Sequence, residues 1–401
     1  MDAVLTVISS LTLDRIILIF MMVFSLLGAV DHIRGDRNGL GKAFTEGFGT
    51  MGSLVLAVAA VYASSPFIAS VLSPFVARLS ALTGIDAGTV PGIFLSSDMG
   101  GYALSMEMAS DEAMGNFGGL ILAGTIGQVW VFVIPVALSA IEKKDRRIFA
   151  SGLLCGLVTV PFACIAGGCV MMLTGFSLTF GSILLNTLPA FILAAAVSLF
   201  LFLKPGPTVK VFSVFGTAVT AAITALTAVA AFEEVTGITF PVFSVMVERG
   251  GNGLTGLDEG LLLSGKIALV LSGAFPMMKW LEKHCRGFFN ALGRKLGINT
   301  SSTLGLLSTT ANAIPMFASY FSMDEKGKLL NAAFVVSAGF TFGDYLGFAA
   351  GVGSRMVPAM LVAKLTGGVC ALVLASLLSP VLLGKVKNEI SSDGERRTDV
   401  E

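Results

Sequence analysis

The residue whose type and position most clearly suggest chemistry is Asp344. It lies in the stretch SAGFTFGDYLGFAAG (337–351), between two apolar runs, and is flanked by glycines and by the aromatic residues Phe340, Phe342, Tyr345 and Phe348. Placing one carboxylate at membrane depth costs about 2.5–3.5 kcal/mol, so an acid inside a membrane span is usually a functional residue. The alternative is that Asp344 lies at a helix end and only caps it. We expect Asp344 to belong to a site.

Two further segments, 88–107 and 300–321, are too polar and too interrupted to be ordinary membrane helices, and they contain Asp98 and Asn312. The glycine pair after Asp98 and the Ile-Pro pair after Asn312 suit helix breaks, because proline removes an amide donor and restricts the residue before it. Irregular backbone is tolerated at membrane depth only where protein or a water-filled cavity satisfies it. We therefore predict two broken or re-entrant segments. Close helix packing is the competing explanation for their small residues.

Two carboxylates with aromatic neighbours form the kind of site that binds a small organic cation. An ammonium gains from a desolvated carboxylate, and from an aromatic face by about 0.5–2 kcal/mol. Amide and hydroxyl side chains could hydrogen-bond a hydroxyl on the same substrate. The predicted binding residues are Ser97, Asp98, Tyr102, Gln128, Asn312, Asp344 and Tyr345. For single aromatic residues, including Trp130 and Phe342, packing is the alternative.

The composition defines the class of protein. The chain has 401 residues, of which 54% are hydrophobic and 13% charged, with a mean hydropathy of +0.86. A soluble domain has about 25% charged residues, so the sequence predicts an all-α polytopic membrane protein. The net charge is zero, and no basic patch suggests nucleic acid. The five cysteines and two histidines have no metal-ligand spacing, so we expect no metal and no cofactor.

Nine apolar runs are long enough to span a membrane, and the two broken segments bring the expected total to about 9–11 transmembrane helices. The runs are 14–31, 47–66, 117–141, 148–173, 182–203, 210–232, 261–280, 329–350 and 357–383. The first run follows Asp14 and Arg15, and no cleavage pattern follows it, so we expect a retained helix rather than a signal peptide. We predict one transmembrane domain, 1–384, and a charged, disordered cytoplasmic tail, 385–401.

The sequence also compares with itself. Glu46-Gly47 recurs as Glu259-Gly260 and, at a nearly constant offset, Asp98 falls opposite Asn312 and Gln128 opposite Asp344. These matches predict two repeat units, about 33–174 and 246–384, joined by linking helices at 182–234. Basic residues cluster at 34–42, 143–147, 204–210 and 283–295, which places these loops in the cytoplasm by the positive-inside rule. With both broken segments re-entrant, the two units have opposite orientations, as in secondary transporters.

Several runs resemble the bacterial ethanolamine utilization transporter family. They are SDMGGYALSMEMA (97–109), GLILAG (119–124), IPVALSAIEKKDRR (134–147), AGG (166–168), TANAIPMF (310–317) and SAGFTFGDYLGFAA (337–350). The resemblance covers nearly the whole chain, and Asp98, Asn312 and Asp344 fall inside its motifs. It departs at Gln128 and in the loop 235–257, which leaves the role of Gln128 open.

The resemblance implies a non-enzymatic permease of the bacterial inner membrane that imports ethanolamine. The substrate would then feed a cobalamin-dependent ethanolamine ammonia-lyase. Protonated ethanolamine has an ammonium, two methylenes and a hydroxyl, which suits a pair of aspartates with amide and hydroxyl neighbours. Beyond membrane lipid, the sequence identifies no protein partner, and it does not decide between a monomer and a homo-oligomer.

Two alternatives come from other classes. The first is an ion-coupled secondary transporter of another small solute, such as a carboxylate. It would need cationic sites. Apart from Lys210 and Lys279 at the ends of their runs, only Lys266 and Lys364 lie inside apolar runs, and we expect Lys364 to snorkel to the interface. The second is an intramembrane aspartyl protease, whose Gly-x-Gly-Asp motif would require glycine where this chain has Thr341. Facilitated diffusion and coupling to H⁺ or Na⁺ are equally compatible with the sequence.

Overall fold

The computed structural model describes residues 12–398, apart from 242, 252 and 285, and in this part of the chain it is all-helical with one isolated bridge between Arg249 and Thr255. The α-helices are α2 (Leu13–Ile33), α3 (Leu40–Gly49), α4 (Met51–Leu54), α5 (Ala60–Thr83), α6 (Thr89–Phe94), α7 (Gly101–Met108), α8 (Glu112–Asn116), α9 (Ile134–Ala140), α10 (Arg146–Leu173), α11 (Phe180–Leu203), α12 (Pro205–Thr236), α13 (Gly256–His284), α14 (Arg286–Leu296), α15 (Thr300–Ala311), α16 (Ala313–Ala318), α17 (Glu325–Ala338), α18 (Asp344–Val352) and α19 (Val357–Thr398). Three π-helical stretches are Val55–Ala59, Phe117–Gly127 and Val129–Val133.

Eight helical stretches of the described chain are long and apolar enough to cross a membrane. They coincide with eight of the nine predicted runs, so the prediction of an all-α polytopic membrane protein is confirmed. Large apolar side chains on their outer faces are exposed, among them Leu26 at 70% and Leu377 at 72%. Such surfaces are suited to lipid rather than water. The ninth run, 329–350, is not a continuous span, because α17 ends at Ala338 and α18 begins at Asp344.

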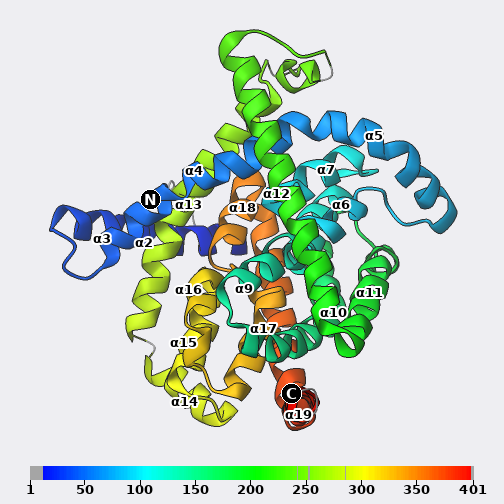
Figure 1. The fold of residues 1–401 in the computed structure, drawn as a ribbon. Helices are drawn as coiled ribbons and strands as arrows, with labels where there is room; N and C mark the ends of the chain where they lie inside the picture. Colours follow the sequence, from blue (N-terminus) through cyan, green and yellow to red (C-terminus); the bar gives the residue numbers. More distant parts are fainter. Residues whose placement is uncertain (1–11, 242, 252, 285, 399–401) are drawn as a thin grey trace.

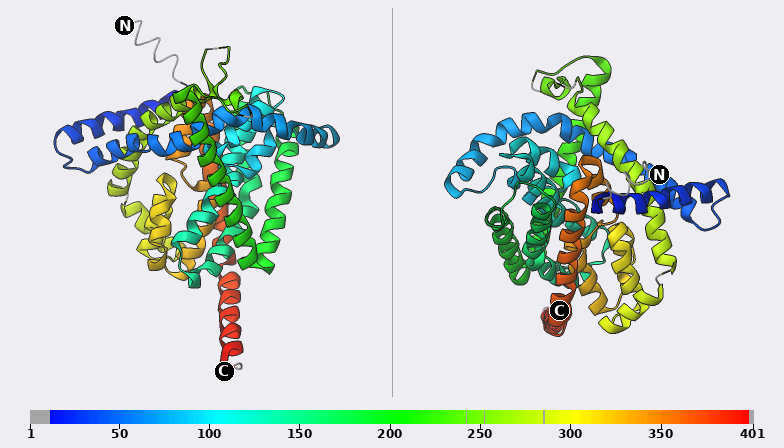
Figure 2. Two further views of the ribbon diagram at one scale, coloured as in Figure 1. Left: turned by 45° about the horizontal axis from the view of Figure 1, so that its top comes forward. Right: turned by 180° about the vertical axis from the view of Figure 1, so that it is seen from behind.

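The helices surround a densely packed centre (Figure 1), in which α10, α17 and α19 contact one another extensively. On one side α2 and α3 form a hairpin that packs on α13, and α5 curves away on the other. At the bottom, α19 leaves the body as a rod and carries the C-terminus (Figure 2). This helix continues to Thr398, where the sequence predicted a disordered tail from 385. Its Lys, Glu and Arg residues have high helix propensity, and 399–401 lie outside the described residues.

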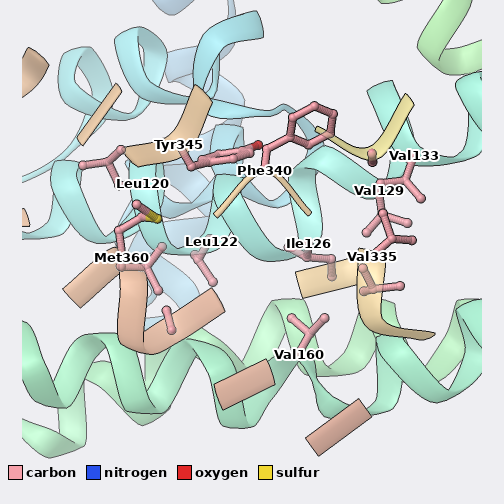
Figure 3. Packing of buried hydrophobic residues seen from close by; sticks show 14 of the residues in the cluster. Leu120, Leu122, Ile126, Val129, Val133, Val160, Val335, Phe340, Tyr345 and Met360 are labelled. Carbon is pink, nitrogen blue, oxygen red and sulfur yellow. The ribbon is translucent and has the colours of Figure 1, made fainter. Parts of the chain in front are cut away.

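The π-helical stretches at 117–133 form the buried core of the molecule. Leu120, Leu122 and Ile126 are completely buried and face side chains from α10, α17 and α19 (Figure 3). A helix that is apolar on every side is stable only when protein surrounds it. The segment that carries Gln128 is therefore held from all directions.

Helical elements follow the same order in two stretches of the chain. A long helical region (α3–α5, or α13 and α14) is followed by a pair of short helices, α6 and α7 or α15 and α16. Next comes an interrupted helix, α8 to α9 or α17 to α18, and then a long one, α10 or α19. Helices α11 and α12 lie between the two stretches. The division into units 33–174 and 246–384, and their opposite orientation, remain predictions.

Candidate substrate-binding site

The first interruption of the backbone lies between α6 and α7 and contains Asp98. Leu95 and Ser96 are extended, Ser97–Met99 form one 3₁₀ turn, and Gly100 has a φ of 103°. This left-handed conformation favours glycine. The Ser97 hydroxyl donates a hydrogen bond to the Gly119 carbonyl, with an O–O distance of 2.7 Å. Asp98 therefore lies on irregular backbone that is fixed to the neighbouring π-helix.

The second interruption, between α17 and α18, precedes Asp344. Phe340 is in the left-handed region with a φ of 59°, which is uncommon for a residue with a side chain. The amides of Phe340 and Phe342 donate to the carbonyls of Thr309 and Thr310 at 2.9 and 2.7 Å. The end of α15 thus holds this break in place. Asp344 is the first residue of α18; the N-cap is Gly343, and no side chain caps the helix.

These breaks meet at a small cavity of about 40 Å³. Five of the seven predicted binding residues line it: Ser97, Asp98, Gln128, Asp344 and Tyr345. The rest of its wall consists of Leu54, Ser96, Phe132, Phe340 and Phe348. Both carboxylates therefore face the same enclosed space. The cavity thus combines one acid from each half of the chain with three phenylalanine rings.

The structure does not bring the other two predicted residues to this cavity. Asn312 caps α16, because its Oδ1 accepts from the Ile314 amide at 2.9 Å. It lines a larger cavity of about 370 Å³ that also contains Glu46. The Tyr102 hydroxyl lies 3.4 Å from Oδ1 of Asn116, and its ring meets Phe348 edge to face at 5.5 Å. Tyr102 therefore supports the cavity wall from behind.

Tyr102 itself faces a third cavity, of about 380 Å³, which contains Glu259. Three residues that line this cavity and three that line the cavity at Glu46 fall at equivalent positions when the sequence is compared with itself. Gly256, Glu259 and Tyr62 line one; Ala43, Glu46 and Phe275 line the other. Two similar hollows therefore accompany the small central cavity.

Lys364 is the residue that sequence reasoning missed. We expected it to snorkel to the interface, but its side chain is 1% exposed in the centre of the molecule. Its Nζ donates to the Gly124 carbonyl and, at 3.3 Å, to Oε1 of Gln128, and lies 3.7 Å from the centre of the Tyr345 ring. The sequence did contain a sign of this burial, because Lys364 lies well inside the apolar run 357–383.

Trp130 was another candidate ring, and the structure gives it a packing role. It is completely buried, its Nε1 donates to the Ile93 carbonyl at 2.9 Å, and its ring stacks on Phe212 at 4.3 Å. Phe342 packs on the edge of the core and does not line the small cavity. Phe132, which we did not predict, does line it and meets Phe340 edge to face.

A chain of apolar helices whose interrupted segments converge on a small polar cavity belongs to the class of multi-pass membrane transporters. The model of the family described as "Ethanolamine utilisation protein, EutH" matches residues 13–378. The chain belongs to this family, and it is a transporter rather than an enzyme. This rules against the intramembrane protease.

Curated relatives cover almost the same length. "Probable ethanolamine permease EutH" of Listeria monocytogenes is 38% identical over 377 residues, covering 94% of this chain and 97% of the relative. Proteins with the same description from Salmonella typhimurium and Escherichia coli are 37% identical over 400 residues, covering 92% of this chain and 96% of theirs. No solved structure matches.

Proposed function

We propose that this protein is an ethanolamine permease of the bacterial inner membrane in which Asp98 and Asp344 bind the substrate ammonium. The observation that carries the proposal is that these two acids, one from each half, line the same small cavity. An ammonium group has three hydrogens to donate and no acceptor. A pair of carboxylates offers it several acceptor oxygens in a space where water is scarce.

The size of the cavity supports a substrate as small as ethanolamine. One water needs about 10–15 Å³ of such space, so the 40 Å³ here corresponds to roughly three or four non-hydrogen atoms. Ethanolamine has four. Choline, with three further methyl groups on nitrogen, is too large for this cavity as it stands.

Polar groups for the substrate hydroxyl come from the break beside Asp98. The Ser97 hydroxyl donates its own hydrogen to Gly119, so its oxygen lone pairs can still accept. Gln128 is less suitable, because its Nε2 donates to the Val336 carbonyl at 2.6 Å and its Oε1 accepts from Lys364. We therefore assign recognition of the substrate hydroxyl to Ser97. Gln128 forms part of the cavity wall and does not bind the hydroxyl.

The breaks at Asp98 and Asp344 would form the centre of an inverted repeat, and the two larger cavities would be its approaches from opposite sides. Rocking of one unit against the other would then expose the acids alternately. The similar lining of the two larger cavities supports this arrangement.

A competition experiment tests the proposal. The purified protein is reconstituted in liposomes, and uptake of radiolabelled ethanolamine is measured with excess ethanolamine, propanolamine, choline or small carboxylic acids. We expect the two amino alcohols to compete, and choline and the acids to have little effect. Competition by carboxylates, or the absence of ethanolamine uptake, would support the alternative of another solute.

A further inference from the structure

The buried ammonium of Lys364 needs an explanation beyond packing. A charged group buried without partners is very costly, so buried lysines are rare unless paired. Here the partners are the Gly124 carbonyl, the Gln128 amide oxygen and the face of the Tyr345 ring.

Each partner of Lys364 is part of the wall of the candidate site or adjoins it. Gln128 and Tyr345 line the small cavity. Gly124 contacts the Tyr345 ring so closely that an added Cβ would lie 3.0 Å from Cε1. Since lysine can only donate, it also fixes which end of the Gln128 amide faces it, and the other end donates to Val336. Lys364 is therefore built into the site.

Three ionisable side chains determine the net charge of the candidate site. With all three groups ionised, Asp98 and Asp344 contribute two negative charges, and Lys364 contributes one positive charge. The sum is one negative charge, which a single ammonium neutralises. Without the lysine, two negative charges would remain, and a doubly charged amine would be the better match. Charges in a desolvated site act more strongly than in water.

We propose that Lys364 is a specificity-determining resident cation, which makes the site accept one singly charged ammonium and reject doubly charged amines. This inference rests on the proposed binding of the substrate ammonium by Asp98 and Asp344. Lys364 acts through the charge of the site and through Gln128 and Tyr345, so we describe it as a positioning residue.

The test compares two ligands of the same size. 1,2-Diaminoethane has the same number of non-hydrogen atoms as ethanolamine and, at mildly acidic pH, carries two charges. Competition of each with radiolabelled ethanolamine is measured in liposomes at that pH for wild type, Lys364→Met, Lys364→Arg and Lys266→Met. Lys266 is the matched control, because it also lies inside an apolar run but is exposed.

We expect wild type, Lys364→Arg and Lys266→Met to favour ethanolamine over the diamine. Lys364→Met should shift the preference at least about tenfold toward the diamine, because it removes the positive charge and keeps most of the volume. An unchanged preference in Lys364→Met would overturn the proposal. So would effective competition by the diamine in wild type.

A second variant covers the case in which Lys364→Met does not fold. Gln128→Glu keeps Lys364 and adds a negative charge at its partner, so the site again has two net negative charges, and the same shift toward the diamine is expected. Binding of each amine is also read as a thermal shift of the purified protein. If wild type binds neither amine, the proposed function fails; if it binds both equally, only the role of Lys364 fails.

Discussion

The two halves of the chain build their breaks in different ways. In the second half, backbone amides of Phe340 and Phe342 bond to backbone carbonyls at the end of α15. In the first half, side chains do this work: Ser97 bonds to the Gly119 carbonyl, and Trp130 bonds to the Ile93 carbonyl. The break before Asp344 is thus tied to its neighbour by backbone bonds, and the break at Asp98 by particular side chains.

The halves also differ in what they contribute to the cavity. Asp98 comes from the pair of short helices in the first half, and Asp344 from the interrupted helix in the second. The equivalent positions carry the amides Asn312 and Gln128, and only Gln128 reaches the cavity. If the predicted repeat is correct, each half has one acid at a non-equivalent place, which gives a site with two chemically distinct sides.

The strongest way to break this comparison is to remove one acid at a time. Asp344→Asn and Asp98→Asn should each abolish ethanolamine uptake. Each variant removes one acidic partner of the substrate ammonium, and removing one partner of a buried pair of opposite charges costs about 3–5 kcal/mol, which corresponds to about 100-fold or more. Uptake is measured in cells alongside membrane abundance, which should be unchanged. Wild-type uptake by Asp344→Asn would sink the assignment of the site.

The close approaches at the breaks give the next largest effect. A Cβ on Gly127 would lie 2.1 Å from the Leu95 carbonyl oxygen, and one on Gly343 would lie 2.0 Å from that of Ala311. Both neighbours are backbone atoms that cannot turn aside, so Gly127→Ala and Gly343→Ala should each lower the free energy of unfolding by at least about 1–3 kcal/mol. Thermal denaturation in detergent measures this, with Gly181→Ala as the control, because nothing lies within 4 Å of that position. Normal stability in both variants would show that the breaks are loosely packed.

Asn312→Ala tests whether Asn312, the counterpart of Asp98 in the second half, also binds substrate. The variant removes the cap of α16, which should cost about 1 kcal/mol of stability. Because Asn312 does not line the small cavity, uptake should stay within a few-fold of wild type. Denaturation and uptake are measured on the same preparations. A loss of uptake as complete as that of Asp98→Asn would return Asn312 to the binding site.

The smallest effect is expected in the two larger cavities. Glu46→Gln and Glu259→Gln should each weaken the apparent affinity for ethanolamine by no more than about threefold, since neither acid lines the small cavity and charges that remain partly exposed to solvent contribute little. The effect should diminish as salt is added, because screening shortens the range of the charges. Uptake at low and high ionic strength checks this, and a large, salt-independent loss would show that these acids bind substrate directly.

Much of this arrangement could be predicted from local sequence. Apolar runs of membrane length predicted the class, and eight of the nine predicted runs are helices long enough to span a membrane. The glycine pair predicted the break beside Asp98, and the Ile-Pro pair predicted the break beside Asn312. The break at 339–343 was missed because we assigned it to the continuous apolar run 329–350, whereas its backbone is held by the carbonyls of Thr309 and Thr310. Hydrogen bonds between segments this far apart in the chain cannot be predicted from a local sequence pattern.

The site shows the same limit. The self-comparison paired Asn312 with Asp98 by their order along the chain, but it could not tell in which direction each side chain points. Lys364 was assigned to the interface because snorkelling is common, whereas its depth depends on partners more than two hundred residues away. The π-helix around Gln128 likewise depends on tertiary packing rather than on any local preference.

The length of α19 has a practical consequence. At a rise of about 1.5 Å per residue, its 42 residues extend over roughly 60 Å, more than the about 40–45 Å of a whole bilayer. Its far end stands clear of the body (Figure 2), while Lys364 lies on the same rod at the other end. A spin label or fluorophore attached near its tip would therefore report tilting of the helix that carries Lys364, without touching the substrate cavity.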